Sequence, residues 1–142
     1  MRGGGITRAT GLQFATDDYS IKYQGMNVSI EQEIVAKGLT APRVTPADIE
    51  AAIASEWYII AADGVPHDGF HAPVPARHPL RQLTFCVLVL CNGFTVTGES
   101  ACASPENFDA ELGRKIARQN AVSKMWPLLG YALKCELSKA EK

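Results

Sequence analysis

Residues 82–126 decide the fold and read QLTFCVLVLCNGFTVTGESACASPENFDAELGRKIARQNAVSKMW. An apolar run at 83–91 is followed by Asn92 and Gly93, and then by a second β-favouring run at 94–99. Asn-Gly between two such runs is a strong hairpin signal, because a two-residue type I′ turn needs positive φ at both positions. The sequence therefore predicts a central antiparallel hairpin over about 82–99.

The length of the loop determines which residues of the hairpin face each other. If Asn92 and Gly93 form the whole loop, Cys91 pairs with Phe94 and Val89 pairs with Val96. One face is then entirely apolar and consists of Phe85, Val87, Val89, Cys91, Phe94 and Val96. The other face is half apolar, so we expect a helix or a second subunit to cover each face.

A long helix is predicted to follow at about 105–126. Ser104, Pro105 and Glu106 supply a cap, a proline at the first helical position and a negative charge at the positive end of the dipole. At 100° per residue, one apolar stripe is expected to pack on the sheet: Phe108, Leu112, Ile116, Val122 and Trp126. On another side lie Ala117, Ala121 and Met125, which are small enough for a second helix to approach. Two apolar sides predict a homo-oligomer through the 105–126 helix, and Pro127 is expected to stop or kink it.

The segment upstream predicts a second helix and a third strand. TPAD at 45–48 reads as a helix start, and Ile49, Ile53 and Trp57 recur every four residues, which predicts a helix at about 46–56. The next residues favour a strand near 57–62, with helical continuation as the alternative. Four prolines at 64–79 predict a loop.

These elements predict a single α+β domain at 29–142, with a small antiparallel sheet packed with helices. A short helix is expected at 30–37, with Ser29 as its cap and Gly38 as its stop. Residues 1–28 are predicted to be a disordered extension, and translation starting at Met26 is an alternative to Met1.

Composition excludes several classes of protein. The net charge of −1 argues against binding of bulk nucleic acid or of anionic membranes. The longest apolar run, 85–91, is too short to span a bilayer, and the N-terminus does not resemble a signal peptide. The four cysteines lack the spacing of a disulfide framework, which indicates a reduced intracellular setting.

Two stretches carry candidate binding groups. Arg114 and Arg118 are four apart and share a helix face, which suits phosphate oxygens; ion pairing with Glu111 is the alternative. The small residues at 100–104 join strand to helix and could cradle an anion, with plain close packing as the alternative. A nucleophilic Cys102 would need a nearby base, and the histidines lie elsewhere.

No metal site or cofactor is predicted. His67, His71 and His78 occur in the proline-rich loop, which cannot be the helix that a 67/71 metal pair would need. Cys86 and Cys91 have opposite strand parity, so a regular strand cannot aim both at one ion.

Residues 92–131 resemble a family of small tailed-phage proteins named for gene-49 and gene-66 products. The resemblance is carried by NGF at Asn92, SAC at Ser100, PENFD at Pro105 and GRKIAR at Gly113. TPADIEAAIASE at Thr45 and AADGV at 61–65 extend it, so that it covers about 45–131.

That family is similar to class-one Thoeris anti-defence proteins, which sequester cyclic ADP-ribose isomers or cyclic oligonucleotides without cleaving them. The resemblance implies a phage-encoded, non-enzymatic, oligomeric protein that binds such a ligand in the host cytoplasm and blocks host immunity. Chemistry within the matched stretch selects the ligand residues Asn92, Phe94, Ser100, Cys102, Phe108, Arg114 and Arg118. The arginines would bind phosphate and an aromatic ring would stack on a base.

Two alternatives remain open. The chain could be an interaction protein that binds and inhibits a host protein, which requires only an exposed patch. It could also be a hydrolase of the same nucleotides, which would require a general base beside Ser100 or Cys102.

Overall fold

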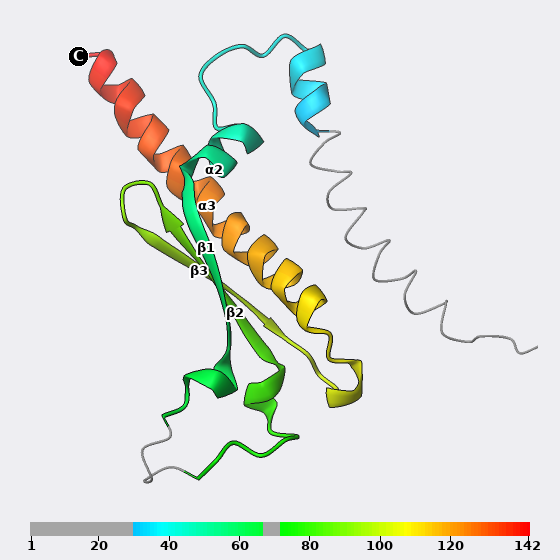
Figure 1. Cartoon of the computed structure of the whole chain (residues 1–142). Coiled ribbons are helices and arrows are strands. Elements are labelled where there is room, and N and C mark those ends of the chain that lie inside the picture. The colour runs from blue at the N-terminus through cyan, green and yellow to red at the C-terminus, as the bar shows by residue number, and fades with distance from the viewer. Residues whose placement is uncertain (1–29, 67–71) are drawn as a thin grey trace, which may run out of the picture. The chain divides into compact units, whose positions relative to one another are not determined.

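The computed structural model describes residues 30–66 and 72–142 (Figure 1). The chain divides into two units, Met1–Pro42 and Arg43–Lys142. The described part of the first unit contains a helix at 30–36, which ends near Gly38 at φ 65°. This helix agrees with the predicted one, whereas Ser29 and the predictions for 1–28 lie outside the described residues.

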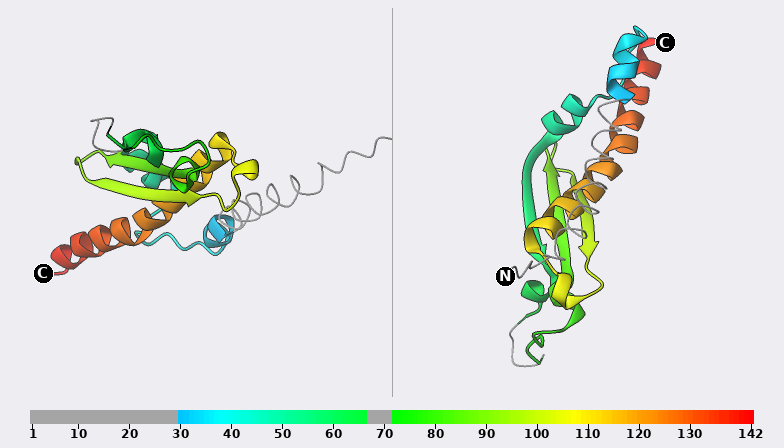
Figure 2. Two further views of the ribbon diagram at one scale, coloured as in Figure 1. Left: turned by 90° about the horizontal axis from the view of Figure 1, so that it is seen from below. Right: turned by 90° about the vertical axis from the view of Figure 1, so that its right-hand side faces the viewer.

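The second unit is an α+β domain, as predicted. Its elements are α2 (Pro46–Ala52), β1 (Ile53–Ile60), η1 (Ala61–Gly64), η2 (Pro79–Gln82), β2 (Leu83–Leu90), β3 (Thr95–Ala101), η3 (Pro105–Asn107) and α3 (Ala110–Ala140). The strands form one antiparallel sheet in the order β1-β2-β3. Figure 2 shows α3 lying across one side of this sheet.

The predicted start of α2 is confirmed, but its predicted end is wrong. Thr45 Oγ1 accepts from Asp48 N (3.2 Å), and Thr45 N donates to Asp48 Oδ2 (2.8 Å), which completes a capping box. The helix ends at Ala52, and β1 begins at Ile53 instead of near 57. Pairing of β1 with β2 overrides the four-residue spacing, so Ile49 is buried in the core while Trp57 is exposed.

The hairpin is confirmed, but its predicted register is wrong by one residue. Leu90 N donates to Phe94 O (2.8 Å), so the loop has three residues, 91–93. Only Gly93, at φ 84°, has positive φ, as in a type I turn followed by a left-handed glycine. A one-residue shift exchanges the two faces of a strand. Cys86, Leu88 and Leu90 therefore face the core.

α3 starts later and runs further than predicted. Ser104 makes no capping hydrogen bond, and Asp109 Oδ1 instead accepts from Leu112 N (2.8 Å) at the true start. The helix continues through Pro127 to Ala140. A helical proline loses one backbone hydrogen bond, and here Leu128 and Leu129 pack against the core on the same stretch, which offsets that loss.

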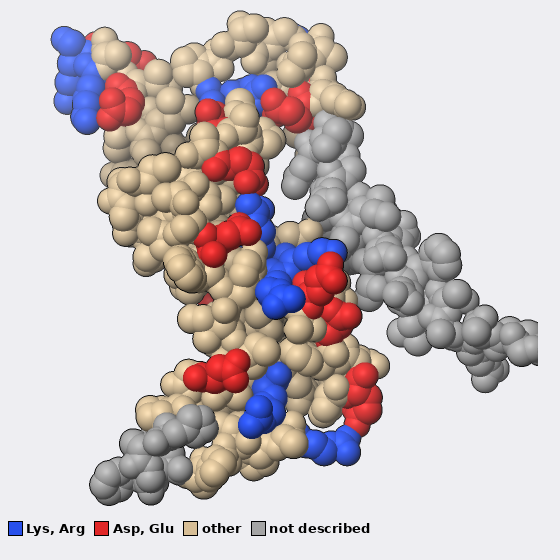
Figure 3. Space-filling model, viewed as in Figure 1, with Lys and Arg blue, Asp and Glu red and all other residues tan. Residues whose placement is uncertain are grey.

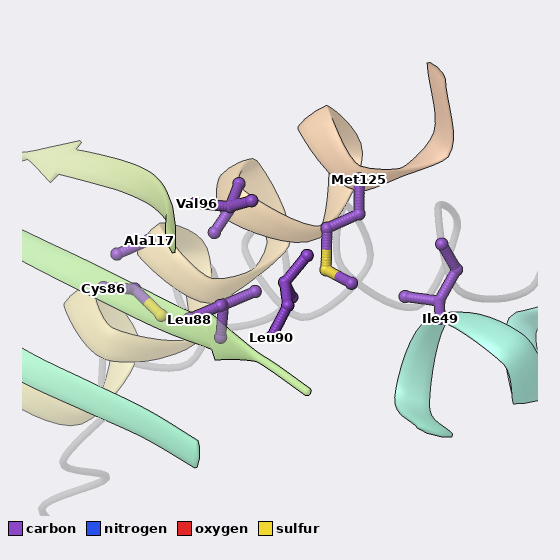
Figure 4. Packing of buried hydrophobic residues seen from close by; sticks show 8 residues of the cluster. Ile49, Cys86, Leu88, Leu90, Val96, Ala117 and Met125 are labelled. Carbon is purple, nitrogen blue, oxygen red and sulfur yellow. The ribbon is translucent and has the colours of Figure 1, made fainter. Parts of the chain in front are cut away.

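The two predicted faces of α3 are exchanged. Its buried residues are Gly113, Ala117, Ala121 and Met125. The last three belong to the core cluster with residues of the sheet, and Figure 4 shows Ala117 and Met125 among them. The predicted stripe of larger residues, which includes Ile116 and Trp126, is only half-buried. The reason is Gly98 on β3, since a Cβ there would lie 2.1 Å from the backbone oxygen of Ala117. The small residues therefore admit a strand rather than a second helix.

The opposite face of the sheet is uncovered within the described part of 43–142. Trp57 is 61% exposed and Ile59 is 45% exposed on this side. Their cross-strand neighbours Val87 and Phe85 are half-buried. The expectation that each face is covered by a helix or a second subunit is thus met by a helix on one face only.

Candidate functional site

The predicted ligand residues lie at separate places in the fold. Ser100, Cys102 and Phe108 line a cavity of about 260 Å³ between the end of β3 and the start of α3. Asn92 and Phe94 line an apolar cavity of about 370 Å³ beside the second half of α3. Arg114 lines a third cavity, and Arg118 lines none of these three.

The length of α3 keeps these cavities apart. Leu128 lines the hairpin cavity, and Arg114 precedes it by 14 residues. At about 1.5 Å per residue, this separation is roughly 21 Å along the helix axis. A small molecule bound within one chain therefore cannot contact both Phe94 and Arg114.

Arg118 is engaged by two carboxylates. Its Nη2 lies 2.9 Å from Glu50 Oε2, and its Nε lies 2.7 Å from Glu56 Oε2. These pairs tie α3 to α2 and to β1. The hydrogen bond from Arg118 holds the pKa of Glu56 below its usual range, and its two acidic partners raise the pKa of Arg118. A ligand phosphate at Arg118 would have to compete with both carboxylates.

Arg114, in contrast, has no acidic partner among the described residues. The expected alternative partner, Glu111, pairs with Lys115 at 3.0 Å. Arg114 lies one turn into α3 and borders a cavity of about 250 Å³, which is also lined by Tyr58 and Ile60 of β1, Asp63 of η1 and Thr84 of β2. The Arg114 pocket, as we name this cavity, therefore presents an unpaired guanidinium beside the first turn of a helix.

The wall of this pocket contains an unusual polar atom. Thr84 is 2% exposed, and its Oγ1 has no hydrogen-bond partner within 30–66 and 72–142. A Cβ at Gly113 of α3 would lie 3.1 Å from this Oγ1, so a larger residue at 113 would crowd the threonine. Burial of an unsatisfied hydroxyl costs about 1–3 kcal/mol. Because Thr84 and Arg114 line the same cavity, a ligand oxygen there could complete the hydrogen bonding of this hydroxyl after rotation about χ1 of Thr84.

Tyr58 forms the β1 side of the pocket. Its hydroxyl donates to Glu56 Oε1 (3.2 Å), and burial, with the charge of Glu56, raises its pKa to about 12. Tyr58 therefore stays neutral at physiological pH and adds an aromatic surface without adding negative charge to the pocket.

The other two cavities offer fewer free polar groups to a ligand. The Cys102 thiol donates to Ser104 O (3.1 Å), and Asn92 Oδ1 accepts from Phe94 N (3.0 Å), so both predicted polar groups are used within their own loops. Phe94 is 53% exposed and faces the cavity that Tyr131, 74% exposed, also lines. The hairpin cavity is thus mainly aromatic and aliphatic.

Charge is distributed without a dominant sign. Acidic and basic side chains are interspersed on the face drawn in Figure 3, and neither forms a broad patch. No group of three or more His, Cys, Asp or Glu within 30–66 and 72–142 could hold a metal ion. His67 and His71 lie outside these residues, and His78 accepts from Leu80 N (3.3 Å) as the cap of η2. No helix in the described ranges is long and apolar enough to cross a membrane.

Sequence reasoning missed Thr84, Tyr58 and Tyr131. Thr84 is a polar residue in an otherwise apolar strand, and Gly113 is a glycine within a helix. These two unusual residues are the sequence signal for a close contact between the strand and the helix. Tyr58 is predicted to lie in a strand but not in a site, and Tyr131 lies beyond Pro127, where the sequence predicts that the 105–126 helix stops or kinks.

Comparison with known proteins gives one match. No curated protein and no solved structure is significantly similar to this chain. A family model described as phage protein (N4 Gp49/phage Sf6 gene 66) family matches residues 44–137, which span β1 to β3, most of α3 and the Arg114 pocket. The chain therefore belongs to the N4 Gp49/phage Sf6 gene 66 family of phage proteins.

Proposed function

We propose that this phage protein binds a small cyclic nucleotide stoichiometrically and sequesters it without chemistry, to block host immunity. The observation that carries the proposal is Arg114, a guanidinium without an acidic partner in the described part of the chain. Arg114 lines the same cavity as Thr84, whose buried hydroxyl lacks a partner within the described residues, and it lies one turn into α3. Arginine suits phosphate because its planar fork donates two parallel hydrogen bonds.

The size of the pocket determines how much of a nucleotide it can hold. Its volume of about 250 Å³ is below the usual range for whole ligands, about 300–1,000 Å³. A phosphate with part of its sugar would fit, and the rest of the ligand would extend over Tyr58 and Ile60. Arg118, whose two carboxylates hold it in place, serves the fold in this scheme.

The chemistry of the cavities supports sequestration rather than cleavage. Cys102 donates its thiol proton to a backbone carbonyl, and the described imidazole, that of His78, caps η2. Neither arrangement is a nucleophile poised against a base. The Arg114 pocket offers the Arg114 guanidinium, an aromatic wall and one carboxylate, that of Asp63, which favours a ligand that presents hydroxyl groups beside its phosphate.

Calorimetric titration tests the proposal directly. Purified protein is titrated with cyclic ADP-ribose isomers and with cyclic di- and trinucleotides, and the mixture is then heated and assayed for free ligand. We expect one of these ligands to bind and to be recovered intact. Recovery of a cleaved product would show that the protein hydrolyses the ligand and does not merely sequester it.

Two arginine-to-alanine variants and one lysine control locate the site. Arg114→Ala should weaken binding by about 1.5–3 kcal/mol, which is roughly 10- to 150-fold. Lys115→Ala removes the same charge from the next residue and should bind normally, since Lys115 pairs with Glu111. Arg118→Ala should lose stability rather than affinity measured on the folded protein. Unchanged affinity in Arg114→Ala would exclude this placement.

A second candidate function is favoured by the hairpin cavity. Phe94 and Tyr131 expose aromatic surface around an apolar cavity of about 370 Å³, which suits a side chain of a partner protein. If the chain inhibits a host protein here, Phe94→Ser with Tyr131→Ser should abolish capture of that protein. Arg114→Ala should leave the capture unchanged, which separates the two functions.

A further inference from the structure

Within the described residues, side chains of α3 form hydrogen bonds with the backbone at the β3 edge of the sheet but not at the β1 edge. Along β3, Lys124 Nζ donates to Thr97 O (2.7 Å) and Asn120 Nδ2 donates to Glu99 O (2.7 Å). These side chains occupy the outward carbonyls that another strand would need. The edge of β3 is therefore closed, in the way natural sheets protect their edges.

The hydrogen-bonding pattern of the sheet identifies the groups at the β1 edge. Leu90 N to Phe94 O is a ladder bond, and antiparallel bonding alternates from it. The even-numbered residues of β2 consequently bond β3, and its odd-numbered residues bond β1. The odd-numbered residues of β2 stand opposite Ser55, Trp57 and Ile59.

The intervening residues of β1 consequently turn their backbone groups outward. Glu56, Tyr58 and Ile60 direct N–H and C=O away from β2, and no partner for them lies within the described ranges. β1 contains no proline or lysine, and the register irregularity lies at its start, between Ile53 and Ser55. Residues 55–60 form a regular, unprotected edge.

Side chains next to this edge are also unburied. Trp57 is 61% exposed, which leaves roughly 90–150 Å² of its surface in water. Ile59, two residues along on the same face, is 45% exposed. An open edge with exposed apolar neighbours is a template for strand pairing.

We propose that β1 pairs with β1 of a second copy, antiparallel, about a two-fold axis at Tyr58. An antiparallel edge is complementary to itself under such an axis. In this register Tyr58 meets the partner's Tyr58, and Glu56 meets the partner's Ile60, so all the outward groups are satisfied. Trp57 faces the partner's Ile59 in a non-hydrogen-bonded pair, where side chains approach most closely.

The pairing has a consequence for the Arg114 pocket. A two-fold axis through paired strands keeps both α3 helices on one face of the combined sheet. Tyr58 and Ile60 line the pocket, so the partner's strand would pair with two residues of its wall. The dimer does not depend on the proposed nucleotide, and its test contains none.

The oligomeric state of the full chain is the test. Stable interfaces bury about 1,200–2,000 Å², and a single pair of short strands with Trp57 and Ile59 is a small contact, so we expect weak association. Light scattering is therefore recorded from micromolar to near-millimolar protein, where we expect a concentration-dependent dimer. Monomer throughout would overturn the proposal.

Paired variants distinguish the β1 edge from the open face. Trp57→Lys should raise the dimer dissociation constant at least about tenfold, because it puts a charge against the partner's Ile59. Thr97→Lys is the control, since Thr97 occupies the same row of the same face on β3. Dissociation by both variants, or by neither, would contradict edge pairing.

Cross-linking tests the register. In a hydrogen-bonded pair the Cα atoms are about 5.5 Å apart, a distance that a disulfide spans. Tyr58→Cys in a Cys91→Ser background, which removes the exposed native thiol, should form a covalent dimer on mild oxidation. A dimer in light scattering without this cross-link would refute the Tyr58 axis.

Discussion

Gly98 determines how closely α3 approaches β3, and Gly98→Ala tests that contact. A Cβ at this position would lie 2.1 Å from Ala117 O and 2.3 Å from Ala121 N. Ordinary contacts are about 3.5 Å, so α3 would have to move by roughly 1 Å or more. Overpacking costs about 1–3 kcal/mol and occasionally more. Because backbone atoms cannot rotate aside, we expect the free energy of unfolding to fall by at least about 3 kcal/mol.

Urea denaturation followed by circular dichroism measures this loss. For a domain of this size, about 3 kcal/mol corresponds to a fall in melting temperature of roughly 12–24 °C. Gly130→Ala is the matched control, because it makes the same change within α3 and its Cβ would meet nothing within 4 Å. Its helix propensity should raise stability by about 0.5–1 kcal/mol. Equal stability of Gly98→Ala and wild type would refute the close contact.

Further predictions concern single polar groups. Thr84→Val should leave the unfolding free energy unchanged or raise it by up to about 2 kcal/mol, because the hydroxyl has no partner in the described part of the chain. A clear loss of stability would show that the hydroxyl does have a partner. Asp109→Ala should lower the unfolding free energy by about 0.5–2 kcal/mol, and Ser104→Ala should leave it unchanged. A loss for Ser104→Ala but not for Asp109→Ala would show that the helix begins at 104. The Arg118 pair lowers the pKa of Glu56, so its contribution is present at pH 7 and is lost as pH falls below about 4.5. Glu56 is 40% exposed, so Glu56→Gln should cost only about 0.2–1 kcal/mol at pH 7, and in urea titrations this difference should disappear in acid.

The hairpin illustrates what local sequence signals can predict. Asn92 and Gly93 correctly locate the turn, because few other residue pairs suit it. The choice between a two-residue and a three-residue loop depends on small differences in turn energy and on which face the rest of the chain covers. The strand at 83–90 is apolar on both faces, so its pattern could not select the register. Only the packing of α3 makes Leu88 a core residue instead of Val87.

The long helix shows a different limit. Its position and apolar character are readable from residues 105–126, but the assignment of its faces assumed that the largest side chains are the most buried. The opposite holds because Gly98 lets the helix backbone approach the strand. That contact joins residues about twenty apart in sequence, and no local pattern records it. Arg114 and Arg118 look equivalent at four-residue spacing, and they differ only because α2 and β1 bring two carboxylates to one of them.

The Arg114 pocket and the open edge of β1 have a common origin in this contact. Gly98 and the small residues of α3 draw the helix over β2 and β3, where Lys124 and Asn120 then close the β3 edge. The same placement leaves β1 without a helix packed along it. The side chain of Arg118 still extends from α3 to pair with Glu56 of β1. The pocket is the resulting gap between β1 and the first turns of α3. A change that shifted α3 toward β1 would therefore fill the pocket and cover the edge together, so ligand affinity and dimerisation should be lost in parallel.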